Sequence, residues 1–248
     1  MEKCILKIRD LTKTYHTKKE EIKAVEKFNL DLMEGEGVAI VGPSGCGKST
    51  ILSILSGIDK EYGGKVIFDN IKFGYMFQQD ALLDYKTILD NALLGLEIEG
   101  SLNKDTKEYV INLLKTYGLK DFINSYPSSL SGGMRQRVAL IRTLATKPDI
   151  ILLDEPFSAL DYQTRLIISD DVYKILKNEG KSFIMVTHDI AEAISMADKV
   201  VILSSRPSKV KKIIDVDFKD KTTPINNRKC ELFNAYYEAI WKEIDYNV

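Results

Sequence analysis

The sequence predicts an α/β fold with a mostly parallel sheet. Continuous apolar runs at residues 38–41 and 150–153 are typical of strands that are buried on both faces. Segments with helical periodicity separate such runs, and strands that alternate with helices favour a parallel sheet with covered faces. A chain of 248 residues is also long enough to bury a sizeable core.

The elements of the first third are mainly strands. Alternating or continuous apolar residues predict strands at 5–8, 28–32, 38–41, 66–68 and 73–77. Between the third and fourth of these, Ile51, Leu52, Ile54 and Leu55 have helical spacing, so we expect a helix at 49–56 that ends at Gly57.

Helical periodicity dominates the middle of the chain. It predicts helices at 87–97, 104–117 and 134–145, within a helical insert over about 79–145. The alternation then returns, with strands at 150–153, 183–186 and 200–203, a helix at 165–177 and a last helix at 230–246. One face of that last helix carries apolar side chains, and packing on the sheet of the same chain is favoured over a membrane or partner contact. These side chains are Phe233, Tyr236, Tyr237, Ile240, Trp241 and Ile244.

Composition excludes several classes of protein. The chain has 35 basic and 36 acidic residues, so no net positive field is available to hold nucleic acid. The three cysteines, Cys4, Cys46 and Cys230, are too widely spaced for a metal site or a disulfide framework, which is typical of a reducing cytosol. The longest apolar runs have four residues, far short of the roughly 20 that span a bilayer. We therefore expect a soluble intracellular protein with no direct membrane insertion.

A glycine-rich segment between a predicted strand and a predicted helix fits a phosphate loop. Its residues match the pattern G-x-x-x-x-G-K-[ST] and are Gly42, Pro43, Ser44, Gly45, Cys46, Gly47, Lys48 and Ser49. Glycines let several backbone N–H groups converge on phosphate oxygens, and the following helix points the positive end of its dipole at them. We expect Lys48 to reach the β- and γ-phosphates, Ser49 to ligate Mg²⁺ and Thr50 to contact a more internal phosphate. The alternative is a glycine-rich turn with a surface lysine.

Two acidic residues end the buried strand at 150–153. A parallel sheet delivers such residues to the edge where it binds ligands. Asp154 is suited to the Mg²⁺ shell, and Glu155 is suited to polarise the attacking water as general base. Alternatively, Asp154 caps the next turn of an acidic loop.

A second candidate anion site precedes the helix at 134–145. Ser131 is a good N-cap, and Gly132 and Gly133 free the backbone behind it. One phosphate loop already cradles one nucleotide, so a second helix terminus with this chemistry needs a separate explanation.

The run Leu-Ser-Gly-Gly at 130–133 resembles the signature of the ATP-binding-cassette (ABC) ATPases. The order and spacing of the other motifs are similar too: 42–50 to Walker A, 150–155 to Walker B, 157–161 to the D-loop and 187–189 to the switch region. The resemblance implies a P-loop NTPase (RecA-like) core with an N-terminal antiparallel β part and an inserted helical subdomain. In a single domain over 1–248, the implied parts are a core at 1–78 and 146–217, a helical subdomain at 79–145 and a helical tail at 218–248.

The resemblance also implies roles for single residues. Tyr15 would stack on adenine, and His188 would contact the γ-phosphate and orient the water with Glu155. Gln78 would touch Mg²⁺ and the water, with Gln79 as the competing choice. The catalytic set is then Glu155, His188, Lys48 and Gln78, and the metal set is Ser49, Gln78 and Asp154.

The family pairs two ATPase domains head to tail. Ser131, Gly132 and Gly133 would therefore serve the γ-phosphate of the partner's ATP, and Asp161 would bridge across the homodimer.

We expect thiol alkylation of Cys46, inside the phosphate loop, to inhibit the protein and ATP to protect it.

Residues 155–161 resemble the form found in importer ATPases. Residues 196–210 resemble the ATPases of the importers of nitrate, sulfonates and taurine, and residues 77–97 are similar to theirs as well. The resemblance implies a peripheral protein on the cytoplasmic face of the membrane, whose surface near 79–96 docks a transmembrane permease and, through it, serves a solute-binding protein. The alternatives are an exporter or lipoprotein-release ATPase, or a non-transport ABC ATPase that acts on nucleic acid or the ribosome. The transported solute stays open.

Overall fold

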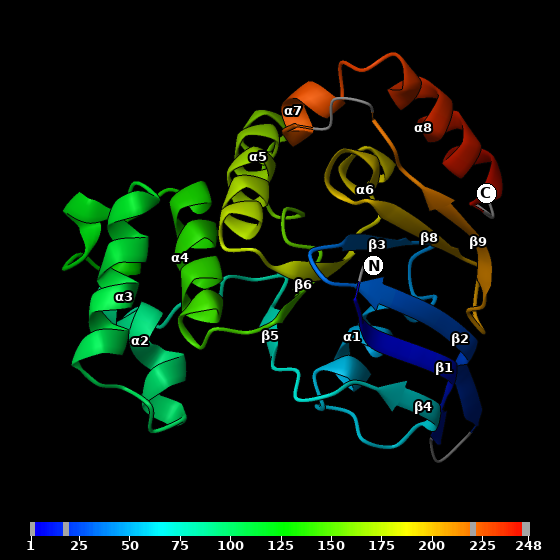
Figure 1. Ribbon diagram of the computed structural model, residues 1–248, viewed down its shortest axis with the longest axis horizontal. Helices are drawn as coiled ribbons and strands as arrows, with labels where there is room; N and C mark the ends of the chain where they lie inside the picture. The colour runs from blue at the N-terminus through cyan, green and yellow to red at the C-terminus, as the bar shows by residue number, and fades with distance from the viewer. Residues whose placement is uncertain (1–2, 17–19, 219–221, 245–248) are drawn as a thin grey trace.

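The protein is organised around a six-stranded sheet (Figure 1). The computed structural model describes residues 3–16, 20–218 and 222–244. The strand order is β5-β6-β7-β3-β8-β9; β9 is antiparallel to β8, and the other neighbours are parallel. The strands are β3 (Gly37–Val41), β5 (Phe73–Met76), β6 (Ile150–Asp154), β7 (Ser182–Val186), β8 (Lys199–Leu203) and β9 (Val210–Asp215). The predicted α/β class is confirmed.

A second sheet is antiparallel and contains the N-terminal strands. Its order is β2-β1-β4, with β1 (Cys4–His16), β2 (Glu21–Met33) and β4 (Gly63–Ile67). Helix α1 (Lys48–Leu55) lies between the two sheets, where its apolar side chains join those of both in one buried cluster (Figure 1). The antiparallel part thus covers one face of the core and supports the helix that follows the phosphate loop.

Side-chain alternation explains why the central strands are apolar at every position. In β3, Val38 and Ile40 point into the cluster that contains α1, whereas Ala39 and Val41 point into the cluster on the opposite face. All four side chains are fully buried. The continuous apolar run therefore reflects a sheet that is covered on both faces, as parallel sheets are.

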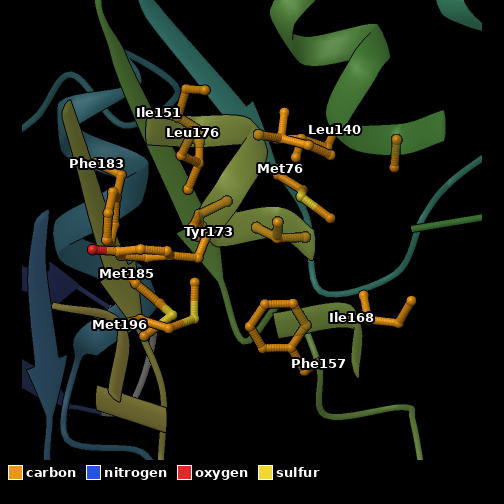
Figure 2. Close-up of a cluster of buried hydrophobic side chains, with 14 of the residues drawn as sticks. Met76, Leu140, Ile151, Phe157, Ile168, Tyr173, Leu176, Phe183, Met185 and Met196 are labelled. Carbon is orange, nitrogen blue, oxygen red and sulfur yellow. The ribbon is translucent and has the colours of Figure 1, made fainter. Parts of the chain in front are cut away.

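Helices cover the opposite face of the sheet. Figure 2 shows this core, where Phe157, Tyr173, Phe183, Met185 and Met196 gather beneath the helices. The helices on this side are α4 (Gly132–Ala145), α5 (Tyr162–Asn178), α6 (Ile190–Met196), α7 (Pro224–Asn227) and α8 (Leu232–Glu243). Helices α2 (Ile88–Ile98) and α3 (Lys104–Thr116) pack against α4, and short 3-10 turns at Lys120–Phe122 and Pro127–Ser129 lead into it.

The structure differs from the sequence prediction in several elements, among them the short helix α7, which was not predicted. Strands β1 and β2 have 13 residues each, far longer than predicted, because their register shifts and Asp10 and Lys27 adopt positive φ, which interrupts the alternation. Helix α6 and strand β9 were not predicted. All residues of α6 but one are buried, so it has no polar face, and β9 is an edge strand rich in exposed residues.

Helix α8 packs on its own chain, as predicted. Phe233, Ile240 and Ile244 are buried in the core cluster, and the helix contacts α6 and β9. Tyr237 stacks on Trp241, which is half exposed. Within residues 3–16, 20–218 and 222–244, none of the helices has the length and apolar composition needed to cross a bilayer.

Candidate functional site

The strand order brings the predicted site residues to one edge of the sheet. Strands β5, β6, β7 and β3 are parallel neighbours, so the segments that follow them meet at their carboxyl ends. These segments carry Gln78, the pair Asp154–Glu155, His188 and the loop at 42–50, respectively. The sequence predicted each motif separately, and the topology makes them one site.

The loop at 42–50 wraps around its own lysine. Lys48 Nζ donates to the backbone oxygens of Gly42 at 2.8 Å and Pro43 at 3.0 Å, and its side chain is buried inside the loop. Gly47 caps α1 with a φ of 115°, a conformation that L side chains rarely adopt, and a Cβ there would lie 3.0 Å from the backbone oxygen of Ala24. The glycine at this position is therefore required both by the backbone and by the close approach of β2.

The Cys46 side chain is buried between the loop and the core, close to Gly42. It is 1% exposed and belongs to the cluster under α1. Burial raises the pKa of its thiol, against the opposing effect of the Lys48 charge. The thiol is shielded in the native fold, which argues against the expectation that alkylation of Cys46 inhibits the protein.

Asp154 is held between two hydroxyl groups. Its Oδ1 lies 3.0 Å from Ser49 Oγ, and its Oδ2 accepts a hydrogen bond from the Tyr75 hydroxyl at 2.9 Å. Burial and the Asp154 charge raise the pKa of Tyr75 well above its usual range, so this phenol stays a donor. The sequence analysis missed Tyr75, whose only signal was its place one residue before the end of the strand that pairs with β6.

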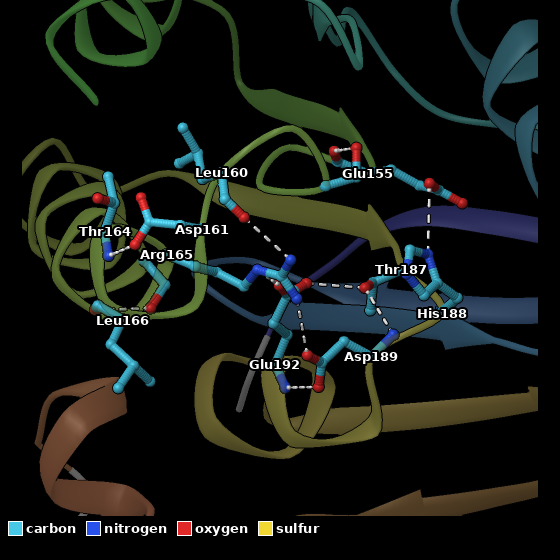
Figure 3. A network of polar contacts seen from close by, with 12 residues as sticks. Glu155, Leu160, Asp161, Thr164, Arg165, Leu166, Thr187, His188, Asp189 and Glu192 are labelled. Carbon is cyan, nitrogen blue, oxygen red and sulfur yellow. Dashed lines mark hydrogen bonds and ion pairs between the residues drawn. The ribbon is translucent and has the colours of Figure 1, made fainter. Parts of the chain in front are cut away.

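Glu155 faces both remaining members of the predicted catalytic set. Its Oε2 lies 3.4 Å from His188 Nδ1 and 3.4 Å from Gln78 Nε2 (Figure 3 shows the histidine contact). Gln78 also bonds to Ser158 Oγ at 3.2 Å, so the structure places Gln78 rather than Gln79 against the glutamate. Glu155 itself has a φ of 44°, and such strain in a non-glycine residue is typical of functional sites.

Tyr15 lies at the end of β1 beside the loop. Its hydroxyl is 3.4 Å from Thr50 Oγ1, and Lys13 Nζ lies 4.8 Å from the centre of its ring. Lys13 is buried and is fixed by Asp59 and the backbone oxygen of Glu61, both at 2.7 Å. The ring is thus partly exposed and firmly placed next to the start of α1.

The second candidate anion site lies elsewhere in the chain. Ser131 caps α4 and accepts from Met134 N at 3.4 Å. A Cβ on Gly133 would meet Ile168 at 2.4 Å, so the glycine permits close packing of α4 on α5. Helices α4 and α1 lie apart, on either side of β5 and β6 (Figure 1). Asp161 caps α5 through Thr164 N at 3.0 Å, and this bonding lowers the pKa of its carboxyl.

The residues around Asp154 fit a magnesium ion. Mg²⁺ prefers oxygen ligands and few protein side chains, because phosphates and water complete its shell. Ser49, Asp154 and Gln78 all offer oxygen atoms, and the 3.0 Å contact between Ser49 and Asp154 places two of them side by side. In the described part of the chain, histidine, cysteine and acidic residues form no cluster of three or more that could hold a metal ion.

Comparison with known proteins places this arrangement in a family. The profile described as "ABC transporter" matches residues 25–158. The uncharacterized ABC transporter ATP-binding protein YtlC of Bacillus subtilis is 40% identical, with 97% of this chain and 95% of that protein covered. The aliphatic sulfonates import ATP-binding protein SsuB of Bacillus cereus is 33% identical, with 96% and 95% covered.

A solved structure has the same fold. The ATP-binding cassette MJ0796, in a dimeric post-hydrolysis state bound to ADP and Pi, superimposes with a TM-score of 0.73 at 35% identity. The match covers 86% of this chain and 100% of that one.

Proposed function

Because this chain belongs to the ABC transporter family of ATP-binding proteins, we propose that it powers an importer for a small nutrient of the nitrate, sulfonate or taurine class. Its reaction is the hydrolysis of ATP to ADP and phosphate. The observation that supports ATP hydrolysis is the convergence of four side chains on one edge of the sheet, namely Lys48, Asp154, Glu155 and His188. The sulfonate import proteins among its relatives support the importer class.

The phosphate loop binds the nucleotide through its backbone and its lysine. Lys48 Nζ exchanges its carbonyl partners, Gly42 and Pro43, for phosphate oxygens. The N–H groups at the start of α1 point at the same phosphates, because the first N–H groups of a helix lack partners within it. The Tyr15 ring offers a face for adenine, and stacking of this kind contributes about 0.5–1.5 kcal/mol.

Ser49, Asp154 and Gln78 would hold Mg²⁺ at this site. When bound, the ion would neutralise negative charge on the phosphate oxygens. Asp154 is oriented for this by Tyr75, whose hydrogen bond leaves Oδ1 turned toward Ser49.

Glu155 acts as the general base. It accepts the proton of the attacking water, while His188 and Gln78, both 3.4 Å from Oε2, orient the water and the γ-phosphate. A glutamine at 155 keeps the shape but removes the proton acceptor, so binding and hydrolysis should separate.

We propose that hydrolysis takes place in a head-to-tail homodimer. Ser131 and Gly132 are exposed at the start of the 14-residue helix α4, which lies away from the phosphate loop of the same chain, so they are available to the nucleotide of a second copy; Gly133 follows them and is buried against Ile168. Closing that interface completes the site, which makes the dimer the switch.

The permease would dock on the groove between β5 and helices α2 and α4. This groove has a volume of about 350 Å³. Its lining includes the apolar side chains of Phe77, Ala81, Leu94 and Ile98 and the guanidinium of Arg142, which offers a polar contact. Phe77, in its lining, directly precedes Gln78 in the chain, so a permease helix bound there would act on the segment that carries Gln78.

Two variants test the ATPase assignment. Lys48→Ala removes the phosphate-binding charge and should abolish hydrolysis. Glu155→Gln should retain ATP but hydrolyse it at least about a hundredfold more slowly, and it should run as an ATP-dependent dimer on a sizing column. Glu99→Gln, at a surface ion pair with Lys72, is the matched control and should behave as wild type. Normal turnover in Lys48→Ala would refute the phosphate-loop assignment.

The importer assignment is tested in native membranes. A tagged chain should co-purify with a transmembrane permease, and the complex should take up a substrate delivered by a solute-binding protein. Purification with an export permease, or with nucleic acid in place of a membrane protein, would contradict the assignment.

A further inference from the structure

Arg165 connects two segments that meet at the site. It lies on α5, and its Nη2 donates to the backbone oxygen of Leu160 at 3.1 Å. Its Nη1 lies 3.3 Å from Asp189 Oδ2, on the loop that follows β7 (Figure 3). One guanidinium therefore binds the segment 157–161 and the loop 187–189 together.

Glu192 fixes that loop from the other side. Its carboxylate accepts a hydrogen bond from Thr187 Oγ1 at 2.8 Å, and its backbone N–H donates to Asp189 Oδ1 at 3.0 Å. Thr187 Oγ1 in turn accepts from Asp189 N at 3.0 Å. These bonds close around His188, which lies between the two bonded residues, so its backbone cannot shift without breaking one of them.

Arg165 and Glu192 lie slightly too far apart for a direct hydrogen bond. Arg165 Nε is buried, and among the described residues no acceptor lies within hydrogen-bond distance of it. The facing oxygen, Glu192 Oε1, lies 3.7 Å away. A buried N–H without a partner is unfavourable, so a shift of about 1 Å that completes this bond is favoured.

Burial and nearby charged groups act on the Glu192 carboxyl in opposite directions. Burial and the nearby Asp189 raise the pKa of Glu192 to about 7, whereas Thr187, Arg165 and Arg228 act in the opposite direction. Glu192 is 3% exposed, so its ionised form depends on these partners for stabilisation. Loss of Arg165 would leave two acidic groups facing each other with one fewer cation.

We propose that Arg165 and Glu192 are positioning residues that pass the placement of residues 157–161 to His188. The inference rests on the proposed function, in which Asp161 in this segment faces the second copy. When the copies close, the segment moves, Arg165 follows through its bond to Leu160, and the Arg165–Glu192 contact tightens the loop that carries His188. Hydrolysis then depends on correct closure and not on nucleotide binding alone.

The test is a double-mutant cycle on steady-state ATP hydrolysis. Arg165→Met and Glu192→Gln should each lower kcat about ten- to a hundredfold, since misplacement by about 1 Å has effects of this size, and leave the KM for ATP within about twofold. The double variant should be no slower than the worse single one, because both act through one contact. Arg165→Lys should recover part of the rate. Lys174→Met removes an exposed lysine on the same helix, which pairs with the buried Asp170; as the control it should keep wild-type kinetics.

Two further measurements separate this role from others. In the Glu155→Gln background, both variants should still form the ATP-dependent dimer, and the melting temperature of the near-isosteric Glu192→Gln should show that its fold is intact. Losses that multiply in the double variant, an unchanged kcat, or a KM that rises together with the fall in kcat would overturn the inference. If wild type itself hydrolyses no ATP, the proposed function fails instead.

Discussion

Replacing Tyr75 by phenylalanine tests how Asp154 is oriented for a metal. The change removes one hydroxyl, whose hydrogen bond to Asp154 Oδ2 is 2.9 Å long. The ring stays packed between β6 and the α1 side of the sheet, since Tyr75 pairs with Leu152 and borders that apolar cluster. The perturbation is thus confined to the support of the carboxylate.

The magnitude follows from the charge and the burial of this bond. A hydrogen bond to an ionised group contributes about 1.5–3 kcal/mol, and the lower end applies because Tyr75 is only half-buried. About 1.4 kcal/mol corresponds to a factor of ten in affinity. We therefore expect the Mg²⁺ concentration for half-maximal hydrolysis to rise about tenfold, within the range known for the supports of metal ligands.

The assay is phosphate release during a Mg²⁺ titration at fixed ATP. The KM for ATP at saturating Mg²⁺ should change less than about twofold, because the phosphate loop is untouched. Tyr109→Phe is the matched control: its hydroxyl makes the same kind of bond, 3.1 Å to Glu179, but on helix α3. An unchanged Mg²⁺ requirement in Tyr75→Phe, or an equal change in Tyr109→Phe, would refute the reasoning.

Two other predictions concern a thiol and an ion pair. Iodoacetamide should label Cys4 and Cys230 in the native protein but Cys46 only after unfolding, because Cys46 is buried; peptide mapping that finds native Cys46 labelled would contradict this. Burial opposes ionisation of Asp80, but the bonds from Arg135, at 2.7 and 3.0 Å, help to outweigh it and lower the pKa of the carboxyl. Asp80→Asn should therefore cost about 1 kcal/mol of unfolding free energy at pH 7 by urea titration. The difference should shrink as the pH falls through the lowered native-state pKa of Asp80, because both states then bind the proton; a gap independent of pH would contradict it.

The contiguous motifs could be predicted from the sequence because their chemistry is local. The phosphate loop needs glycines, a lysine and a helix start within nine residues, and all of these are adjacent in the chain. Buried strands could be recognised for a similar reason, since their apolar runs are continuous. Strands β1 and β2 extend much further than their patterns, because positive φ at Asp10 and Lys27 reverses the alternation.

Contacts between distant segments could not be predicted in this way. Tyr75 and Asp154 are 79 residues apart, and nothing in either segment indicates that their strands are neighbours. The inward turn of Cys46 likewise depends on packing beneath α1. Its place inside the motif predicted the opposite, because a motif defines the backbone path and not the direction of each side chain.

The sequence by itself determined the chemistry of this protein: a loop for phosphate, a carboxylate pair and a second glycine-led helix start, each encoded within a few consecutive residues. Only the tertiary structure decided other contacts between distant groups, such as Tyr75 with Asp154, or Arg165 with Glu192. The physical reason is that strand order and helix packing are set by the burial of apolar faces across the whole chain, and that burial fixes distances between residues that no local pattern relates.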